Sequence, residues 1–262
     1  MSLDPQTIAA LAARLETAER DAREIPKITD DHPDLGWEDA YAIQDAIRAR
    51  KEARGHRVVG FKAGLTSFAK MKQMGVSTPV FGFLTEAMRR PDDGAIETAA
   101  LIHPKAEAEI GIVTKTALAG PGCDVAAVRA ATDFVIPGLE IIDSRYRDFR
   151  FDVASVIADN TSAARYVLGT QRAPLDALDL PTLGVVLEKN GEIVATATGA
   201  AVLGQPLAAV ALLANHLALR GHPLPAGSLV LTGGMTEAIA VGPGDRLCAR
   251  FHDLGTVAMR FV

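Results

Sequence analysis

The sequence predicts an α+β fold, in which a mostly helical N-terminal part precedes a larger β-rich part. Through residues 1–78, apolar side chains recur at the spacing of three to four residues that one helix face requires. Beyond Pro79, short apolar runs alternate with glycine, proline and asparagine. This pattern is typical of strands and turns in a largely antiparallel or mixed sheet. We therefore predict a helical cap region over residues 1–78 and a β-rich domain over residues 79–262.

Composition narrows the class of protein. The chain has 262 residues, of which 48% are hydrophobic and 23% charged, the balance of a globular protein with a buried core. A net charge of −5 offers no basic field for nucleic-acid phosphates. No run approaches the roughly 18 consecutive apolar residues of a membrane span, and Asp4 stands where a signal peptide would have its basic region. We predict a cytoplasmic protein without nucleic-acid or membrane partners.

The two cysteines agree with an intracellular location. Cys123 and Cys248 are too few for a disulfide framework, and their spacing is not that of a metal-binding pair. A reducing compartment is the natural environment for such a chain.

Start and stop signals define the N-terminal elements. We predict helices over residues 4–23 and 37–54, a β-branched apolar strand over 57–62, and a short helix that ends at Gly75. Asp4-Pro5 begins the first helix with proline at its first position, and Gly55 ends the second. Thr66 or Ser67 can cap the short helix.

The β-rich part contains seven predicted strands, over residues 106–114, 135–142, 184–188, 193–198, 229–232, 246–252 and 256–261. Asn190-Gly191 separates two of them and predicts a tight hairpin, because both residues tolerate positive φ. One helix is expected to interrupt the strands, over residues 206–220, where apolar side chains recur on one face before Gly221.

Three carboxylates stand out in these strands. Glu107 and Glu109 project from the same strand face, about 7 Å apart. A lone Glu-x-Glu is usually a solvent-facing sheet edge, but Glu140 is the only charge in the apolar run 135–142, where an unneutralised carboxylate is costly. On neighbouring strands the three would form a hard oxygen site for Mg²⁺ or Mn²⁺. Zinc is disfavoured, since His103 is the only nearby imidazole and no cysteine is present.

Other polar groups leave alternatives open. Lys62 follows an apolar run and could reach an anionic substrate, or it could be an exposed strand-end lysine. Residues 159–162, Asp-Asn-Thr-Ser, could form part of a site or a plain turn. The glycine pair after Thr232 lets a backbone approach an anion closely, but no phosphate-loop pattern accompanies it.

Four ordered motifs together resemble a known family. They are Phe61-Lys-Ala-Gly-Leu-Thr-Ser67, Pro104-Lys-Ala-Glu-Ala-Glu-Ile110, Glu140-Ile-Ile-Asp-Ser-Arg145 and Val156-Ile-Ala-Asp-Asn-Thr-Ser162. This set resembles the hydratase and decarboxylase branch of the fumarylacetoacetate hydrolase superfamily, and the likeness runs through nearly the whole chain. It implies a helical N-terminal portion packed on a mixed β-sandwich roll. It also implies a 2-oxo acid substrate, and Mg²⁺ or Mn²⁺ held by Glu107, Glu109 and Glu140.

The resemblance assigns roles to further residues. Lys62 would orient the substrate or stabilise an enolate oxygen, Ser162 would hold the substrate carboxylate or a metal-bound water, and Asp159 joins them as a catalytic residue. The substrate-binding residues that it implies are Thr66, Ser67, Val80, Asn160, Thr232 and Gly233.

Within this branch, the chain resembles the decarboxylases of meta-cleavage degradation of aromatic compounds, which act on an unsaturated 2-oxo dicarboxylate. The sister hydratases typically have an aspartate in the segment that reads Thr-Pro-Val-Phe-Gly over residues 78–82, where this chain has Val80. Addition of water needs a group that handles protons near the substrate, whereas decarboxylation benefits from an apolar pocket. A metal-dependent carbon-carbon lyase is therefore the predicted activity.

Three alternatives remain. The first is hydration of 2-hydroxypenta-2,4-dienoate at the same metal site. The second is acylpyruvate hydrolysis, which normally uses a His and Glu pair in the N-terminal cap, and His32 with Glu38 matches that pair poorly. The third is a non-catalytic partner of a hydratase, because members of this branch are associated with two-enzyme complexes. Such a complex with the pathway hydratase, or a homo-oligomer, is compatible with the catalytic prediction as well.

Overall fold

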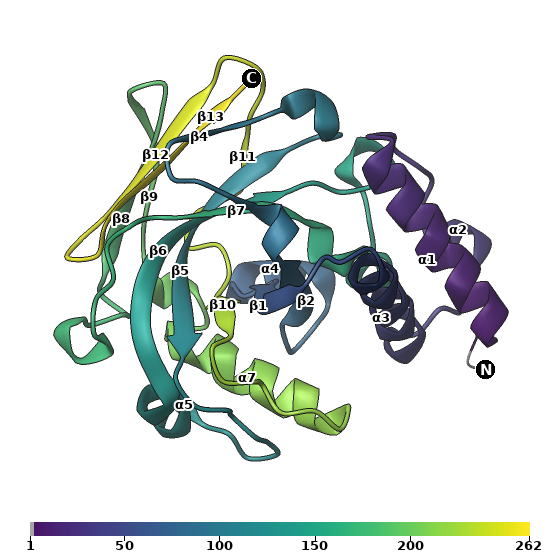
Figure 1. Ribbon diagram of the computed structural model, residues 1–262, viewed down its shortest axis with the longest axis horizontal. Coiled ribbons are helices and arrows are strands. Elements are labelled where there is room, and N and C mark those ends of the chain that lie inside the picture. Colours follow the sequence, from purple (N-terminus) through teal and green to yellow (C-terminus); the bar gives the residue numbers. More distant parts are fainter. Residues whose placement is uncertain (1–2) are drawn as a thin grey trace.

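The computed structural model describes residues 3–262 and places a layer of N-terminal helices beside two curled sheets (Figure 1). The N-terminal elements are α1 (Pro5–Arg20), α2 (Ile28–Asp31), α3 (Trp37–Ala53), β1 (Val58–Gly64) and α4 (Phe68–Met74). The α+β class and the packing of helices on a mixed β-roll are as predicted.

The predicted caps begin and end these helices. The Asp4 side chain accepts hydrogen bonds from the first-turn N–H groups of α1, which ends at Arg20, three residues before the predicted end. Ser67, not Thr66, caps α4, and Gly75 ends it in the left-handed conformation with φ 67°. Local hydrogen bonding therefore explains why these segments are helical where the sequence indicated.

The larger sheet has eight strands in the order β2-β1-β10-β5-β6-β7-β3, with β11 paired to β5. Their bounds are β2 Val80–Thr85, β3 Arg89–Arg90, β5 Lys105–Thr114, β6 Thr132–Ile142, β7 Ala163–Leu168, β10 Leu229–Leu231 and β11 Ile239–Ala240. Most pairs are antiparallel, while β1 with β10 and β3 with β7 are parallel. Strand β1 pairs with β2 and β10, so this sheet continues across the predicted boundary at residues 78 and 79, which stays a prediction.

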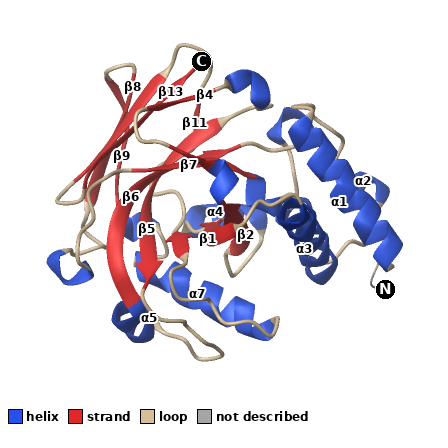
Figure 2. Cartoon of the chain, viewed as in Figure 1, coloured by secondary structure: helices blue, strands red, loops and turns tan. Residues whose placement is uncertain are grey.

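The smaller sheet has five strands in the order β4-β13-β12-β8-β9. Their bounds are β4 Gly94–Ile96, β8 Gly184–Lys189, β9 Glu192–Thr198, β12 Arg246–Phe251 and β13 Gly255–Phe261. The β8–β9 hairpin turns at Asn190 and Gly191, with φ values of 56° and 88°, as predicted. Figure 2 shows the strands of both sheets in red, with α1, α2 and α3 together on one side of them.

One expectation about the β-rich part is wrong. Besides α7 (Pro206–Leu219), two short helices interrupt it, α5 (Val125–Ala131) and α6 (Val153–Ala158). Aspartates cap both, Asp124 and Asp152, but the helices are too short to show a helical period in the sequence. Strands β2, β3, β4, β7 and β11 were also not predicted.

Two hydrophobic cores lie on opposite faces of the larger sheet. The first lies between the sheets and contains Ile110 of β5, Leu139 of β6 and Leu247 of β12. The second packs the other face against the N-terminal helices, including Leu15 of α1 and Ile43 of α3. The odd-numbered residues of the first half of β5 therefore point toward the helical side.

One described helical segment has the length and composition of a membrane span. Gly199–Leu219 has 21 residues and a mean hydropathy of 1.6, although polar residues interrupt its apolar run. In this fold α7 buries Leu207, Val210 and Leu213 in the first core. A buried core helix can have the same length and apolar composition as a membrane span, so this segment is weak evidence for a membrane location.

Candidate metal centre and active site

The three predicted glutamates meet on the helical side of the larger sheet. Strands β5 and β6 are antiparallel, and their register places Glu107 directly opposite Glu140. Glu109 lies two residues further along the same face of β5. One carboxylate oxygen from each residue lies within 4.8 Å of the others. Glu109 and Glu140 are 0% exposed and Glu107 is 6% exposed, which excludes the solvent-facing alternative.

The buried carboxylates lack enough positive partners within the protein. Burial raises the pKa of Glu109 well above its ordinary value, and the charge of Glu140 adds to this effect. Glu109 Oε1 and Glu140 Oε1 accept no hydrogen bond, while the Gly233 N–H donates to Glu109 Oε2 at 2.8 Å. Buried charged oxygens without partners are costly, and a group of three carboxylates suits a hard divalent cation. The donor set therefore fits Mg²⁺ or Mn²⁺.

Lys62 reaches this centre from β1. Its Nζ lies 3.0 Å from Glu140 Oε2 and donates a hydrogen bond to the Thr161 carbonyl at 3.0 Å. Burial disfavours the ammonium, but Glu140, Glu109 and Glu107 outweigh that effect and raise the pKa of Lys62. The side chain is only 3% exposed, so the exposed strand-end alternative is excluded.

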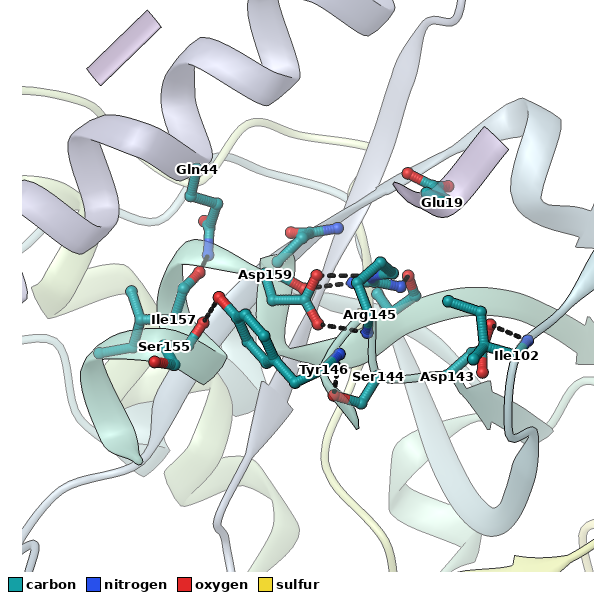
Figure 3. A network of polar contacts seen from close by, with 12 residues as sticks. Glu19, Gln44, Ile102, Asp143, Ser144, Arg145, Tyr146, Ser155, Ile157 and Asp159 are labelled. Carbon is teal, nitrogen blue, oxygen red and sulfur yellow. Dashed lines mark hydrogen bonds and ion pairs between the residues drawn. The ribbon is translucent and has the colours of Figure 1, made fainter. Parts of the chain in front are cut away.

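Residues 159–162 form a buried turn rather than a surface one. Asp159 pairs with Arg145, as Figure 3 shows, and the Asn160 amide bonds both the N–H and the carbonyl of Phe83. The Thr161 and Ser162 hydroxyls are buried without a hydrogen-bond partner. Unpaired buried hydroxyls are unusual and are available to a ligand.

A cavity of about 600 Å³ opens beside the metal centre. Six of the predicted site residues line it, and they are Lys62, Thr66, Ser67, Val80, Glu107 and Ser162. Glu109 and Glu140 lie behind its wall. The structure therefore brings the predicted metal ligands, Lys62 and Ser162 to one place.

Besides Glu109 and Glu140, four predicted residues do not line the cavity. Asp159 and Asn160 contact Arg145 and Phe83, as described above. The Thr232 hydroxyl donates to the Ile110 carbonyl at 3.0 Å, and Gly233 contacts Glu109 through its N–H. Their predicted direct roles stay predictions, and their contacts support neighbouring site residues.

The cavity also contains residues that sequence reasoning missed. Lys70 Nζ lies 3.2 Å from Glu107 Oε1, and Lys105 Nζ lies 4.1 Å from the centre of the Phe149 ring. Lys105 precedes Glu107 by two residues and so shares its strand face, a signal that could have identified it. Lys70 has no signal that distinguishes it from an ordinary helix-surface lysine.

Comparisons with known proteins agree with this site. The family model described as fumarylacetoacetate (FAA) hydrolase C-terminal matches residues 62–262. The chain is 55% identical to a 4-oxalocrotonate decarboxylase of Pseudomonas sp. (strain CF600), covering 100% of this chain and 99% of that one. It is 38% identical to a 2-hydroxyhexa-2,4-dienoate hydratase of Comamonas testosteroni, covering 98% of each.

A solved structure has nearly the same fold over the full length. It is the 4-oxalocrotonate decarboxylase from Pseudomonas putida G7 complexed with magnesium and adipate, with a TM-score of 0.98, 52% identity and coverage of 100% of this chain and 99% of that one. Sequence, fold and carboxylate site together show that the chain belongs to the fumarylacetoacetate hydrolase family.

Proposed function

We propose that the protein is a Mg²⁺- or Mn²⁺-dependent decarboxylase of 2-oxo-3-hexenedioate (4-oxalocrotonate) in meta-cleavage degradation of aromatic compounds. The products are CO₂ and 2-hydroxypenta-2,4-dienoate, the enol of 2-oxopent-4-enoate. One observation carries the proposal. Over its full length the chain is 55% identical in sequence to a 4-oxalocrotonate decarboxylase but only 38% identical to a hydratase, and it has the buried carboxylate site.

Loss of CO₂ breaks a carbon-carbon bond and leaves its electron pair in a dienolate, so negative charge develops on the 2-oxo oxygen. Uptake of one proton from water by that oxygen then gives the enol product. A divalent ion held by Glu107, Glu109 and Glu140 supplies Lewis-acid stabilisation of such charge when bound. This kind of stabilisation is typically several kcal/mol, or some orders of magnitude in rate.

Lys62 supplies a second fixed positive charge. An ammonium has three N–H donors, of which one faces Glu140 and one binds the Thr161 carbonyl. The third is available to a substrate oxygen in the cavity. Paired with Glu140, Lys62 is suited to act as a charged hydrogen-bond donor to such an oxygen. A preorganised donor in a buried site stabilises developing charge strongly.

Apolar residues form much of the rest of the cavity wall. Val80, Leu65, Val156, Phe149 and Phe151 line it. The leaving carboxylate loses its charge as CO₂ forms, so an apolar environment disfavours the charged ground state more than the transition state. Ser162, whose hydroxyl is unpaired, can donate a hydrogen bond to a substrate carboxylate.

Hydration of the dienol is the second candidate, supported by the identity to a hydratase. It needs a proton-handling group where this chain has Val80, so decarboxylation fits better. A purely structural role is disfavoured, because three buried carboxylates without a metal would only reduce stability. A complex with the pathway hydratase and a homo-oligomer stay predictions. A cytoplasmic location is proposed as well, supported by the free thiols of Cys123 and Cys248.

The direct test incubates the purified protein with 2-oxo-3-hexenedioate and Mg²⁺, with and without EDTA, and follows CO₂ and substrate absorbance together. Release of CO₂ that EDTA abolishes is expected. Consumption of 2-hydroxypenta-2,4-dienoate without any release of CO₂ from the dicarboxylate would show a hydratase instead.

A further inference from the structure

A conformationally unusual turn lies directly behind Lys62. Asn160, Thr161 and Ser162 are consecutive, buried and left-handed, with φ values of 48°, 53° and 57°. L-residues disfavour this conformation, and a β-branched threonine does so most. Such a turn persists only where surrounding contacts hold it, and turns of this kind concentrate at functional sites.

The turn makes two contributions to the active site. The Thr161 carbonyl accepts the hydrogen bond of Lys62 Nζ, and the Thr161 and Ser162 side chains line the cavity. The turn is also pressed against β1, because a Cβ on Gly64 would lie only 2.4 Å from the Thr161 methyl group. A shift of the turn would therefore move the oxygen that orients the Lys62 ammonium.

Arg145 bonds both ends of this turn. Its Nε contacts the Asp159 carboxylate, its Nη2 contacts the Asp159 carbonyl, and its Nη1 donates to the Ala163 carbonyl at 3.2 Å. Its backbone N–H donates to Asp159 Oδ2 at 3.1 Å. Figure 3 shows these contacts as dashed lines between Arg145 and Asp159. Arg145 and Asp159 are both buried, and neither lines the cavity.

We infer that Arg145 is a positioning residue, which clamps the turn from Asp159 to Ala163 so that Thr161 holds Lys62 in its productive orientation. The planar guanidinium is suited to this task because its donors have a fixed geometry that a lysine ammonium lacks. The inference rests on the proposed function only insofar as Lys62 acts in that reaction. Its structural content, that Arg145 controls the surroundings of Lys62, is independent of any activity.

The first test is a double-mutant cycle between Arg145→Lys and Lys62→Met. Arg145→Lys keeps the positive charge but loses the planar guanidinium with its fixed donors. We expect this substitution to lower kcat by about 10- to 100-fold. In the Lys62→Met background, Arg145→Lys should cause little further loss of kcat, because both substitutions remove the same function, that of Lys62. Equal losses in both backgrounds, or wild-type kcat in folded Arg145→Lys, would overturn the inference. Arg147→Lys is the matched control, since the Arg147 side chain is 62% exposed, and it should leave kcat unchanged.

The second test needs no activity. In metal-free protein with ¹³C-labelled lysine, the Lys62 Cε signal is identified by its absence in Lys62→Met. Arg145→Lys should displace this signal, whereas Arg147→Lys should not, and an unmoved signal contradicts the clamp. If wild-type protein releases no CO₂ but Arg145→Lys displaces the Lys62 signal, the proposed function is wrong while the positioning role of Arg145 is supported. Asp159→Asn, which keeps one acceptor oxygen for Arg145, repeats both tests should Arg145→Lys fail to fold.

Discussion

Lys62 Nζ lies 3.0 Å from Glu140 Oε2 in the buried centre of the protein. Glu140 is thus both a candidate metal ligand and the counter-ion of the only cavity-lining lysine that is buried among the described residues. Three carboxylates carry three negative charges, and Lys62 together with one divalent cation supplies three positive charges. The charges of these buried groups would therefore balance in the loaded centre, which lowers the cost of burying them, while Lys70 contacts Glu107 from the half-exposed edge.

Lys62→Met should lower turnover by about 100-fold or more, because it removes a preorganised donor at the developing charge. Mg²⁺ affinity, measured by calorimetry, should stay the same or rise, since a positive charge beside the ligands is lost. Lys72→Met, on the neighbouring helix surface, is the control. Retained turnover in Lys62→Met would show that this lysine has no catalytic role.

Glu107→Gln should weaken Mg²⁺ binding by at least about 10-fold, because a charged oxygen ligand is replaced by a neutral one. Thermal unfolding with and without Mg²⁺ measures the effect. At 100 times its Kd, the ion should add about 2.7 kcal/mol to the unfolding free energy of wild-type protein. The variant should gain less at the same concentration, and exposed Glu97→Gln should behave as wild type. Unchanged stabilisation would rule out Glu107 as a ligand.

Val80→Asp should slow CO₂ release by about 10-fold or more, because it puts a polar and ionisable group into the apolar wall of the cavity. Val80→Thr, of nearly the same shape but without a charge, controls for packing, and circular dichroism checks folding. Hydration of 2-hydroxypenta-2,4-dienoate should be measured in parallel. Full decarboxylase activity in a folded Val80→Asp protein would remove the argument that separates the two reactions.

His216 should make the fold sensitive to acid. Burial lowers the pKa of His216 to about 4, and its ring lies 4.4 Å from that of Tyr41. Between the ordinary pKa of 6.5 and about 4, the unfolded chain binds a proton that the folded protein does not. The unfolding free energy is therefore unaffected by His216 titration above pH 6.5. It falls as the pH drops toward 4, by up to about 3 kcal/mol, because the unfolded chain gains the proton first.

Urea unfolding of wild type and His216→Phe between pH 7 and pH 4.5 measures this effect. The unfolding free energy of the wild type should fall more steeply toward low pH than that of the variant. Parallel curves would mean that His216 titrates normally in the folded protein.

Local chemistry explains what sequence reasoning found. The caps at Asp4 and Ser67 and the Asn190-Gly191 turn depend on hydrogen bonds and φ preferences within a few residues, which are visible in one stretch of chain. The isolated charge of Glu140 in an apolar strand likewise predicted a buried site. The family resemblance added the roles of Lys62 and Ser162, and both residues do line the cavity.

Long-range contacts explain what it missed. Helices α5 and α6 are too short to show a period, and Lys70 resembles any exposed helix lysine until α4 packs beside Glu107. Arg145 ends one of the four motifs, but its role was not predicted, because its partners at Asp159 and Ala163 lie 14 and 18 residues away.

The sequence by itself determined the residue types of the centre, the strand faces of its carboxylates and the class of metal that such oxygens bind. Only the tertiary structure decided that Glu107 stands opposite Glu140, that Lys62 reaches between Glu140 and Thr161, and that Arg145 holds the turn behind them. The reason is physical: strand register and buried ion pairs are set by packing between segments far apart in the chain, which no local pattern of residues encodes.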